Sequence, residues 1–215
     1  MYNFKYGDKN KKEENNVQVS FDILGNIQKQ EKSSGVNVNK FVDDYVLVDI
    51  ETTGFSPTKD EIIEIGAIKV EKNKIINEYN ELIKINETLS PFTTKLTGIT
   101  DEMLQTGKEI SEVLKDFIHF TGDSIIIGHN VTFDLGFLSY NCKKYLNFNL
   151  NNDYVDTMCI ARKLVPNSIN YKLGTLADFF NVSYEGAHRG LKDVEITYEV
   201  YNNLRKINRY KSHGI

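Results

Sequence analysis

Apolar residues in the first half of the chain are grouped into short runs, which are typical of buried strands. Polar or turn-forming residues bound each run, as they bound the strands of a sheet. Asn73 and Lys74 separate the second run from the third and predict a hairpin turn there. Two shorter runs follow later. The predicted strands are Tyr45–Ile50, Glu61–Val70, Lys74–Ile83, Ser124–Gly128 and Tyr154–Asp156.

After residue 109 the apolar residues recur every three to four positions, which predicts helices. Those from Ile110 to Ile118 share one helical face, for which Ser111 or Thr106 is the candidate cap. Thr132 is the expected cap of the next helix, and Pro166 ends the one after it. The later helices are predicted over Thr132–Leu146, from residue 157 to Val165, over Leu173–Phe180 and over Arg189–Ile207. This order of elements predicts an α/β fold in which a mixed five-stranded sheet carries helices on both faces.

The first 43 residues differ from the rest because they are rich in Asn, Lys, Glu and Ser. Val17, Val19, Phe21 and Ile23 alternate with polar residues, as in a half-buried strand. This short segment is an added edge strand, a docking peptide or a chance alternation in a flexible tail. We therefore expect a flexible extension over residues 1–43, a globular domain over 44–208 and a basic tail over 209–215.

Length and composition limit the classes of protein that the chain can represent. Its 215 residues, of which 40% are hydrophobic, suffice for one sizeable core and exclude two large domains. We find neither an apolar run long enough to span a bilayer nor a signal peptide, so we expect a cytoplasmic protein without membrane contact. Cys142 and Cys159 match no metal-ligand spacing and are expected to be packed thiols.

Charge is unevenly distributed along the chain. Residues 45–140 carry eight basic and sixteen acidic residues, whereas residues 141–215 carry eleven basic and seven acidic ones. An acidic middle and a basic end suit a protein that concentrates cations in one place and contacts phosphates in another. Ordinary solvated surface would also produce this asymmetry.

The first predicted strand ends in two acidic residues, Asp49 and Glu51, followed by a Thr-Thr-Gly turn. Their spacing places both carboxylates on one face of the strand, where they repel each other. A divalent cation between them removes this repulsion. The pair is therefore a candidate metal site, although two solvated acids at a strand end are the simpler alternative.

Two later segments add groups of the same kind. Asp134 lies in the first turn of a helix that follows the strand end Gly128-His129-Asn130, where α/β proteins build their sites. Asp193 opens the last helix, and His188 precedes it in a glycine-flanked loop. Together the three segments supply four carboxylates and one group that titrates near neutrality.

The segments VDIETTG, GHNVTFD and AHRGLKD resemble, in order and spacing, the three motifs of the DEDD exonucleases, in the branch whose third motif holds histidine. The resemblance runs from about Tyr45 to Leu204 and is strongest to the proofreading exonuclease of bacterial DNA polymerase III, as the epsilon subunit or as the module of Gram-positive replicative polymerases. It implies a ribonuclease-H-like fold and hydrolysis from the 3′ end with two divalent cations, Mg²⁺ or Mn²⁺. The product implied is a nucleoside 5′-monophosphate.

The resemblance also implies roles for individual residues. Asp49, Glu51, Asp134 and Asp193 would be the metal ligands, and His188 would take the proton from the attacking water. Leu96 and Ile99 resemble the apolar residues beside the terminal base, Phe133 resembles the aromatic near the sugar, and the backbone of Thr52 and Thr53 would approach the terminal nucleotide. Leu96, Ile99 and Phe133 can equally be core residues. Gly190 stands where the family usually has alanine, which we expect to loosen the start of the helix.

Three hypotheses of function follow. The first is a 3′ to 5′ exonuclease that acts on a single-stranded or frayed DNA end in proofreading or repair. The second, within the same fold, is an exoribonuclease that trims RNA ends. The third is a non-catalytic adaptor that docks on a DNA polymerase or clamp through its N-terminal segment. No polymerase-sized region is present, so coupling to DNA synthesis would require a partner.

Overall fold

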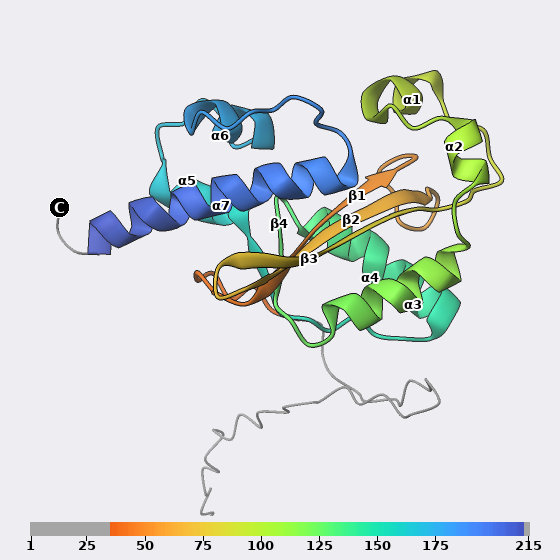
Figure 1. Ribbon diagram of the computed structural model, residues 1–215, viewed down its shortest axis with the longest axis horizontal. Coiled ribbons are helices and arrows are strands. Elements are labelled where there is room, and N and C mark those ends of the chain that lie inside the picture. The colour runs from red at the N-terminus through yellow and green to blue at the C-terminus, as the bar shows by residue number, and fades with distance from the viewer. Residues whose placement is uncertain (1–34, 213–215) are drawn as a thin grey trace, which may run out of the picture.

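The computed structural model describes residues 35–212 and places them around one mixed sheet (Figure 1). The segment from Val17 to Ile23 lies outside the described residues. The sheet has five strands in the order β3-β2-β1-β4-β5. Their bounds are β1 Tyr45–Thr52, β2 Ile62–Glu71, β3 Lys74–Leu82, β4 Ile126–Gly128 and β5 Tyr154–Asp156. All five predicted strands are present, although the fourth is shorter than predicted.

Strand direction changes at β1. The strands β1, β2 and β3 pair antiparallel, and Lys72 and Asn73 form the hairpin turn with positive φ values of 50° and 61°. On its other side β1 pairs parallel with β4, and β4 pairs parallel with β5. The carboxyl ends of β1, β4 and β5 therefore meet at one edge of the sheet, which is where parallel strands usually place a site.

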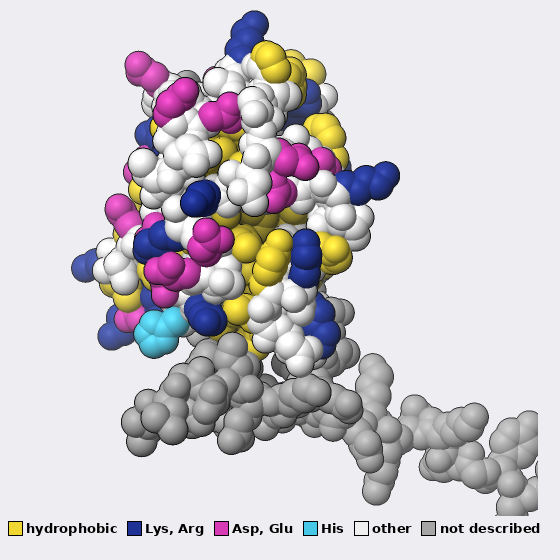
Figure 2. Space-filling model, turned by 90° about the vertical axis from the view of Figure 1, so that its right-hand side faces the viewer, with side chains coloured by type: hydrophobic (Ala, Val, Ile, Leu, Met, Phe, Trp, Pro, Cys, Tyr) yellow, Lys and Arg dark blue, Asp and Glu magenta, His cyan; other side chains and the backbone are white. Residues whose placement is uncertain are grey.

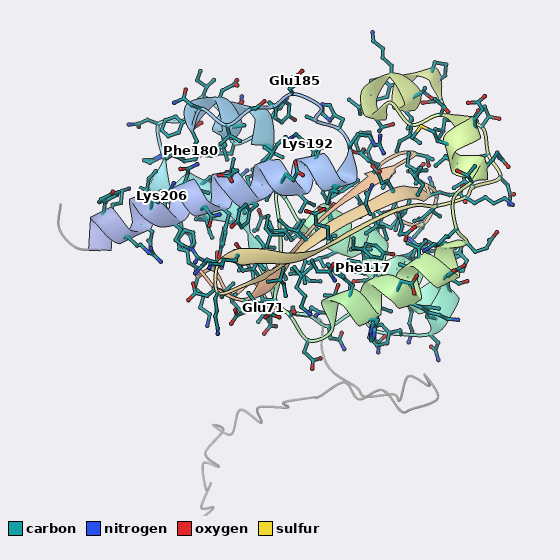
Figure 3. The ribbon with its side chains drawn as sticks, viewed as in Figure 1. Glu71, Phe117, Phe180, Glu185, Lys192 and Lys206 are labelled. Carbon is teal, nitrogen blue, oxygen red and sulfur yellow. The ribbon has the colours of Figure 1, made fainter. Side chains whose placement is uncertain are left out.

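Helices cover both faces of the sheet (Figure 1), as the sequence predicts. One face packs against α3 (Ile110–Thr121) and α4 (Thr132–Leu146), with Phe117 between α3 and the sheet (Figure 3). The other face packs against α5 (Thr157–Leu164), α6 (Leu173–Phe179) and α7 (Gly190–Ser212). No helix in the described part of the chain is both long and apolar enough to cross a membrane.

Two short helices were not predicted from the sequence. They are α1 (Pro91–Thr97) and α2 (Asp101–Gln105). The hydroxyl of Ser90 caps α1 by accepting a hydrogen bond from the N–H of Thr93, and the hydroxyl of Thr100 caps α2 by accepting one from the N–H of Met103. They have too few turns to show an apolar period, although the Ser-Pro start of α1 is a recognisable signal. On the face that carries α1 and α2, acidic and apolar side chains are interspersed (Figure 2).

The predicted helix caps were wrong. Glu109 precedes α3 and makes no side-chain cap bond, so neither Ser111 nor Thr106 caps that helix. Val131 precedes α4, which places Thr132 inside the helix. In addition, α7 continues to Ser212, so residues 209–212 of the predicted tail are helical.

The segment just before β1 contacts the domain. Val36 and Val38 exchange backbone hydrogen bonds with Tyr154, which extends the sheet beyond β5. Phe41 and Val42 pack on the α7 side of the sheet, and Arg205 of α7 bonds to the Val42 carbonyl. Residues 36–42 are therefore attached to the domain, although the sequence assigned them to the extension.

Candidate active site

The end of β1 supplies the first two acids of a cleft. Asp49 and Glu51 alternate with the buried Ile50, so their side chains share the opposite face of the strand. Across the ladder on β2, Asp49 pairs with Gly66 and Glu51 pairs with Glu64. Gly66 has no side chain, which leaves room above the sheet for the start of α7.

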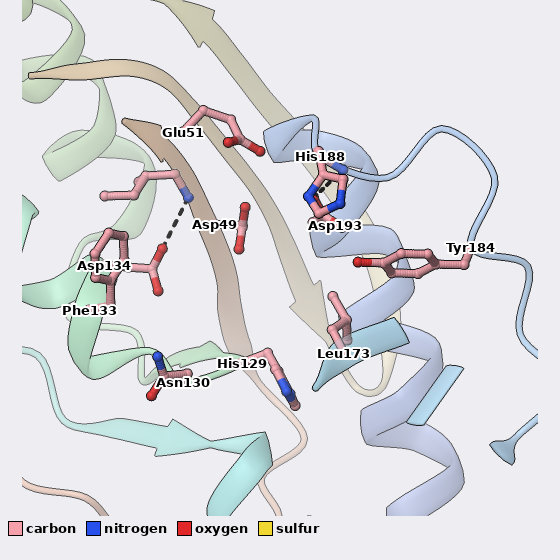
Figure 4. A pocket seen from close by; sticks show the side chains of 11 residues that line it. Asp49, Glu51, His129, Asn130, Phe133, Asp134, Leu173, Tyr184, His188 and Asp193 are labelled. Carbon is pink, nitrogen blue, oxygen red and sulfur yellow. Dashed lines mark hydrogen bonds between the residues drawn. The ribbon is translucent and has the colours of Figure 1, made fainter. Parts of the chain in front are cut away.

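The first turn of α7 brings a third acid to this face. Carboxylate oxygens of Asp49, Glu51 and Asp193 lie within 4.8 Å of one another. Asp134, from α4, lies across the cleft, and its Oδ1 accepts a 3.1 Å hydrogen bond from the N–H of Ile50 (Figure 4). The structure thus gathers all four predicted acids around one cleft.

The cleft has a volume of about 230 Å³ and opens between β1, α4 and the loop that precedes α7 (Figure 4). Side chains of both polar and apolar type form its wall. They belong to Asp49, Ile50, Glu51, His129, Asn130, Phe133, Asp134, Leu173, Tyr184, His188 and Asp193.

Burial raises the pKa values of all four acids, and repulsion from neighbouring carboxylates adds to the effect. Burial, followed by the charges of Asp134, Asp193 and Glu51, raises the pKa of Asp49 well above its usual value. The pKa of Glu51 rises from 4.5 to about 8, chiefly through burial. Burial also raises the pKa of Asp134 to about 8 and raises that of Asp193. Ionised together, the four carboxylates need positive charge in the cleft.

His188 faces the cleft from an uncommon backbone conformation. Its φ is +65°, in the left-handed region that side-chain-bearing residues seldom adopt. Its N–H donates a 2.7 Å hydrogen bond to Oδ2 of Asp193, while Oδ1 of Asp193 is buried without a partner. The ring of Tyr184 meets the imidazole edge to face at 6.1 Å.

The other histidine of the cleft is held by hydrogen bonds. Nε2 of His129 lies 2.7 Å from the carbonyl oxygen of Tyr171, and Nδ1 lies 2.8 Å from Oγ1 of Thr157. Burial lowers the pKa of His129 below its usual value. We therefore regard His129 as a residue that attaches the loop before α6 to the end of β4.

The structure places the apolar residues predicted to contact the terminal nucleotide in different environments. Phe133 lines the cleft, and Leu96 is 42% exposed on α1. Ile99 is fully buried at 0% exposure in a small core with Leu104, so its side chain is a core residue, the alternative that the sequence left open.

The two threonines stabilise the turn after β1. Thr52 donates a 2.6 Å hydrogen bond from its hydroxyl to the carbonyl of Gly54, and Oγ1 of Thr53 accepts one of 2.9 Å from the N–H of Glu61. The turn that follows Glu51, a residue of the cleft wall, therefore has a fixed backbone.

Sequence reasoning missed several residues of the site. Tyr184 directs its hydroxyl toward the cleft (Figure 4), and Leu173 and Asn130 complete the wall. Phe55, 86% exposed, stacks edge-on against Phe133 at 6.4 Å between ring centroids. Asn130 lies within the motif GHNVTFD, which could have drawn attention to it, whereas no motif contains Phe55, Leu173 or Tyr184.

Comparison with known proteins identifies the family. The family model described as "Exonuclease" matches residues 46–201. The DNA polymerase III PolC-type proteins of Caldanaerobacter subterraneus and Thermotoga maritima are 37% and 39% identical over 172 and 171 residues, which is 80% of this chain. The chain spans 12% of the length of each.

Solved structures show the same fold. Exonuclease X in complex with 5′ overhanging duplex DNA is 24% identical, with a TM-score of 0.60 over 80% of this chain and 93% of that one. Escherichia coli exonuclease I in complex with a dT13 oligonucleotide is 19% identical, with a TM-score of 0.66 over 80% of this chain and 42% of that one. The predicted ribonuclease-H-like fold and the resemblance to the DEDD exonucleases are confirmed. By its matched motifs and by the architecture that carries them, this chain belongs to the exonuclease family.

Proposed function

We propose that the protein is a metal-dependent 3′ to 5′ exodeoxyribonuclease that releases nucleoside 5′-monophosphates in proofreading or repair. The observation that carries the proposal is the set of three carboxylates, from Asp49, Glu51 and Asp193, whose oxygens lie within 4.8 Å of one another in a cleft that His188 also lines. This combination suits a metal-dependent nuclease, because the carboxylates can hold cations that neutralise a phosphodiester and the imidazole can deprotonate a water.

The four acids fit divalent cations. The donor set consists only of carboxylate oxygens, which suit Mg²⁺ or Mn²⁺ better than zinc. Asp193 Oδ1 is buried without a hydrogen-bond partner, as expected of an atom that awaits a ligand. Asp49, Glu51 and Asp193 would hold one cation, and Asp49 with Asp134 would hold a second. Bound there, two cations would neutralise the phosphate and lower the pKa of the attacking water.

The protein's own groups would perform the remaining steps. The imidazole of His188 takes the proton from the attacking water. The Asp193 carboxylate holds the backbone of His188 in place by accepting a hydrogen bond from its N–H group. Phe133, which lines the cleft, and Leu96 of α1 would contact the terminal nucleotide, and the backbone of Thr52 and Thr53 would approach it. The neutral hydroxyl of Tyr184 is a further donor for a phosphate oxygen, because burial and then the charges of Asp193 and Asp49 raise its pKa.

The names of related proteins support DNA as the substrate. The matched relatives are DNA polymerases, and the solved neighbours include complexes with duplex DNA and with single-stranded oligonucleotides. We therefore propose that the chain acts on a single-stranded or frayed 3′ end and works beside a DNA polymerase. Docking on a polymerase or clamp is compatible with catalysis, so the adaptor hypothesis becomes an addition to the enzyme hypothesis.

The proposal is tested with matched substrates. Purified protein is incubated with 5′-labelled single-stranded DNA, a duplex with a mispaired 3′ end and an RNA of the same sequence, each with Mg²⁺, with Mn²⁺ and with excess EDTA. We expect stepwise shortening of both DNA substrates from the 3′ end, and slower attack on RNA. Preferential digestion of RNA would favour the exoribonuclease instead, and no digestion would favour an adaptor.

A further inference from the structure

A fifth carboxylate lies beside the four acids of the cleft. Glu64 stands opposite Glu51 in the ladder between β2 and β1, and its side chain is fully buried at 0% exposure. Like charges directly opposite each other on neighbouring strands destabilise a sheet. A buried glutamate at this position therefore needs a specific partner.

The start of α7 supplies that partner. Oε1 of Glu64 accepts a 2.8 Å hydrogen bond from Nη2 of Arg189, and Oε2 accepts bonds of 3.2 Å from Nε of Arg189 and 2.8 Å from the N–H of Gly190. Both carboxylate oxygens of Glu64 thus accept hydrogen bonds, and Glu64 is not one of the three residues whose carboxylate oxygens cluster in the cleft. The fork of the guanidinium matches the carboxylate in a way that an ammonium cannot.

Two glycines allow this contact. A side chain at Gly66 would bring its Cβ within 2.2 Å of the Gly190 carbonyl carbon, and one at Gly190 would lie 2.9 Å from the backbone nitrogen of Gly66 and 3.4 Å from the Asp49 carbonyl oxygen. The backbone of α7 therefore rests directly on β1 and β2. Gly190 permits a close fit here, where the sequence led us to expect a loosened helix.

His188 and Asp193 flank Arg189 in sequence. His188 has the unfavourable φ of +65°, and its N–H is held by Asp193, while the next residue, Arg189, is held by Glu64. The carbonyl of Arg189 also accepts the N–H of Asp193 at 2.9 Å. An uncommon conformation persists only when its surroundings over-determine it, and these bonds do so.

We propose that Glu64 and Arg189 are positioning residues that fix the first turn of α7, so that the His188 imidazole and the Asp193 carboxylate face the reacting phosphodiester. This inference rests on the proposed nuclease function. It extends that function to two residues that would touch neither substrate nor metal. The pair acts as one unit, because loss of Arg189 leaves the buried Glu64 with an uncompensated charge, and loss of the Glu64 charge releases the guanidinium of Arg189, whose side chain is 37% exposed.

The test compares three variants of the full chain. Arg189→Met keeps the aliphatic stem but removes the fork, and Glu64→Gln keeps an acceptor for Gly190 but removes the charge. Arg205→Met is the matched control, because Arg205 is a buried arginine of the same helix that bonds to Asp43, Asn73 and the Val42 carbonyl, far along α7 from His188. Each variant is assayed for kcat and KM on single-stranded DNA, for melting temperature, and for hydrogen exchange of the amides of residues 188–193.

Arg189→Met and Glu64→Gln should each lower kcat about 10- to 100-fold, the usual effect of removing a group that orients a catalytic or ligating residue, with KM nearly unchanged. Exchange of the amides of His188 and Asp193 should accelerate at least roughly tenfold, since each tenfold corresponds to 1.4 kcal/mol of local opening. Arg189→Lys should recover part of the activity, and the double variant should be no slower than the slower single one. Arg205→Met should lower only the melting temperature.

The proposal is overturned if Arg189→Met and Glu64→Gln keep the wild-type kcat and the wild-type exchange of residues 188–193, or if Arg205→Met changes both as they do. Should the wild-type protein cleave no nucleic acid, the proposed function fails while the exchange measurement still decides whether the pair holds the turn. The two failures are therefore distinguishable.

Discussion

Replacing Glu51 with Gln should stabilise the protein in the absence of metal. The pKa of Glu51 is raised from 4.5 to about 8 by burial and by the neighbouring acids. Because the folded-state pKa is the higher one, the wild-type protein loses stability as pH rises from about 4.5 to about 8. At pH 7 the loss amounts to about 3 kcal/mol when each pKa difference of one is converted at 1.36 kcal/mol.

Screening and local relaxation reduce this value, so we expect Glu51→Gln to gain about 1–3 kcal/mol at pH 7. For a domain of this size that raises the melting temperature by roughly 2–12 °C. The assay is thermal unfolding in EDTA from pH 4 to pH 8.5, with Glu199→Gln, an exposed glutamate of α7, as the control.

The difference between Glu51→Gln and wild type should be absent at pH 4, grow with pH, and shrink when Mg²⁺ is added, because the wild type then gains a bound ion that the variant holds less well. The control should show none of these changes. A Glu51→Gln protein that melts at or below the wild-type temperature in EDTA at pH 7 would refute the claim that burial and the neighbouring acids make the ionised Glu51 destabilising.

The remaining predictions concern the base, the N-terminal segment and the apolar residues Leu96 and Ile99. His188→Ala should lose about 10²- to 10⁴-fold in kcat, and a rate within twofold of wild type would exclude His188 as the base. A chain that starts at residue 44 should stay active but melt about 4–8 °C lower than one that starts at residue 35, because it lacks about 2 kcal/mol of packing by Phe41 and Val42; equal melting temperatures would show that their contacts are not stabilising. Ile99→Ala should destabilise the fold by about 2–5 kcal/mol, whereas Leu96→Ala should raise KM with little change in stability, and the reverse pattern would contradict the assignment of Ile99 to the core and of Leu96 to the exposed surface of α1.

The strands β1, β2 and β4 were predictable because apolar runs bounded by polar residues mark them. The acids were predictable for a related reason: Asp49 and Glu51 close such a run, and Asp134 and Asp193 follow in recognisable motifs. The helices α1 and α2 were missed because a helix of one or two turns shows no period.

The parts of the site that depend on tertiary contact could not be predicted. Glu64 reads in the sequence as one polar residue within a strand, and only the arrival of Arg189 and Gly190 gives it a partner. Tyr184 reads as a loop residue, and its place in the cleft follows from its contact with His188 and from the space that Gly174 leaves beside its ring. Such roles follow from packing between distant segments, which local patterns do not encode.

The measurement that tests the central claim most directly is digestion of a 5′-labelled single-stranded DNA by wild-type protein and by Asp49→Asn, each in Mg²⁺ and in excess EDTA. The account predicts loss of one nucleotide at a time from the 3′ end, with nucleoside 5′-monophosphates as products, by the wild type in Mg²⁺ alone. Asp49→Asn should be nearly inactive while it remains folded. Undiminished digestion by the wild type in EDTA, or by Asp49→Asn in Mg²⁺, would contradict the claim that these carboxylates form the catalytic metal site.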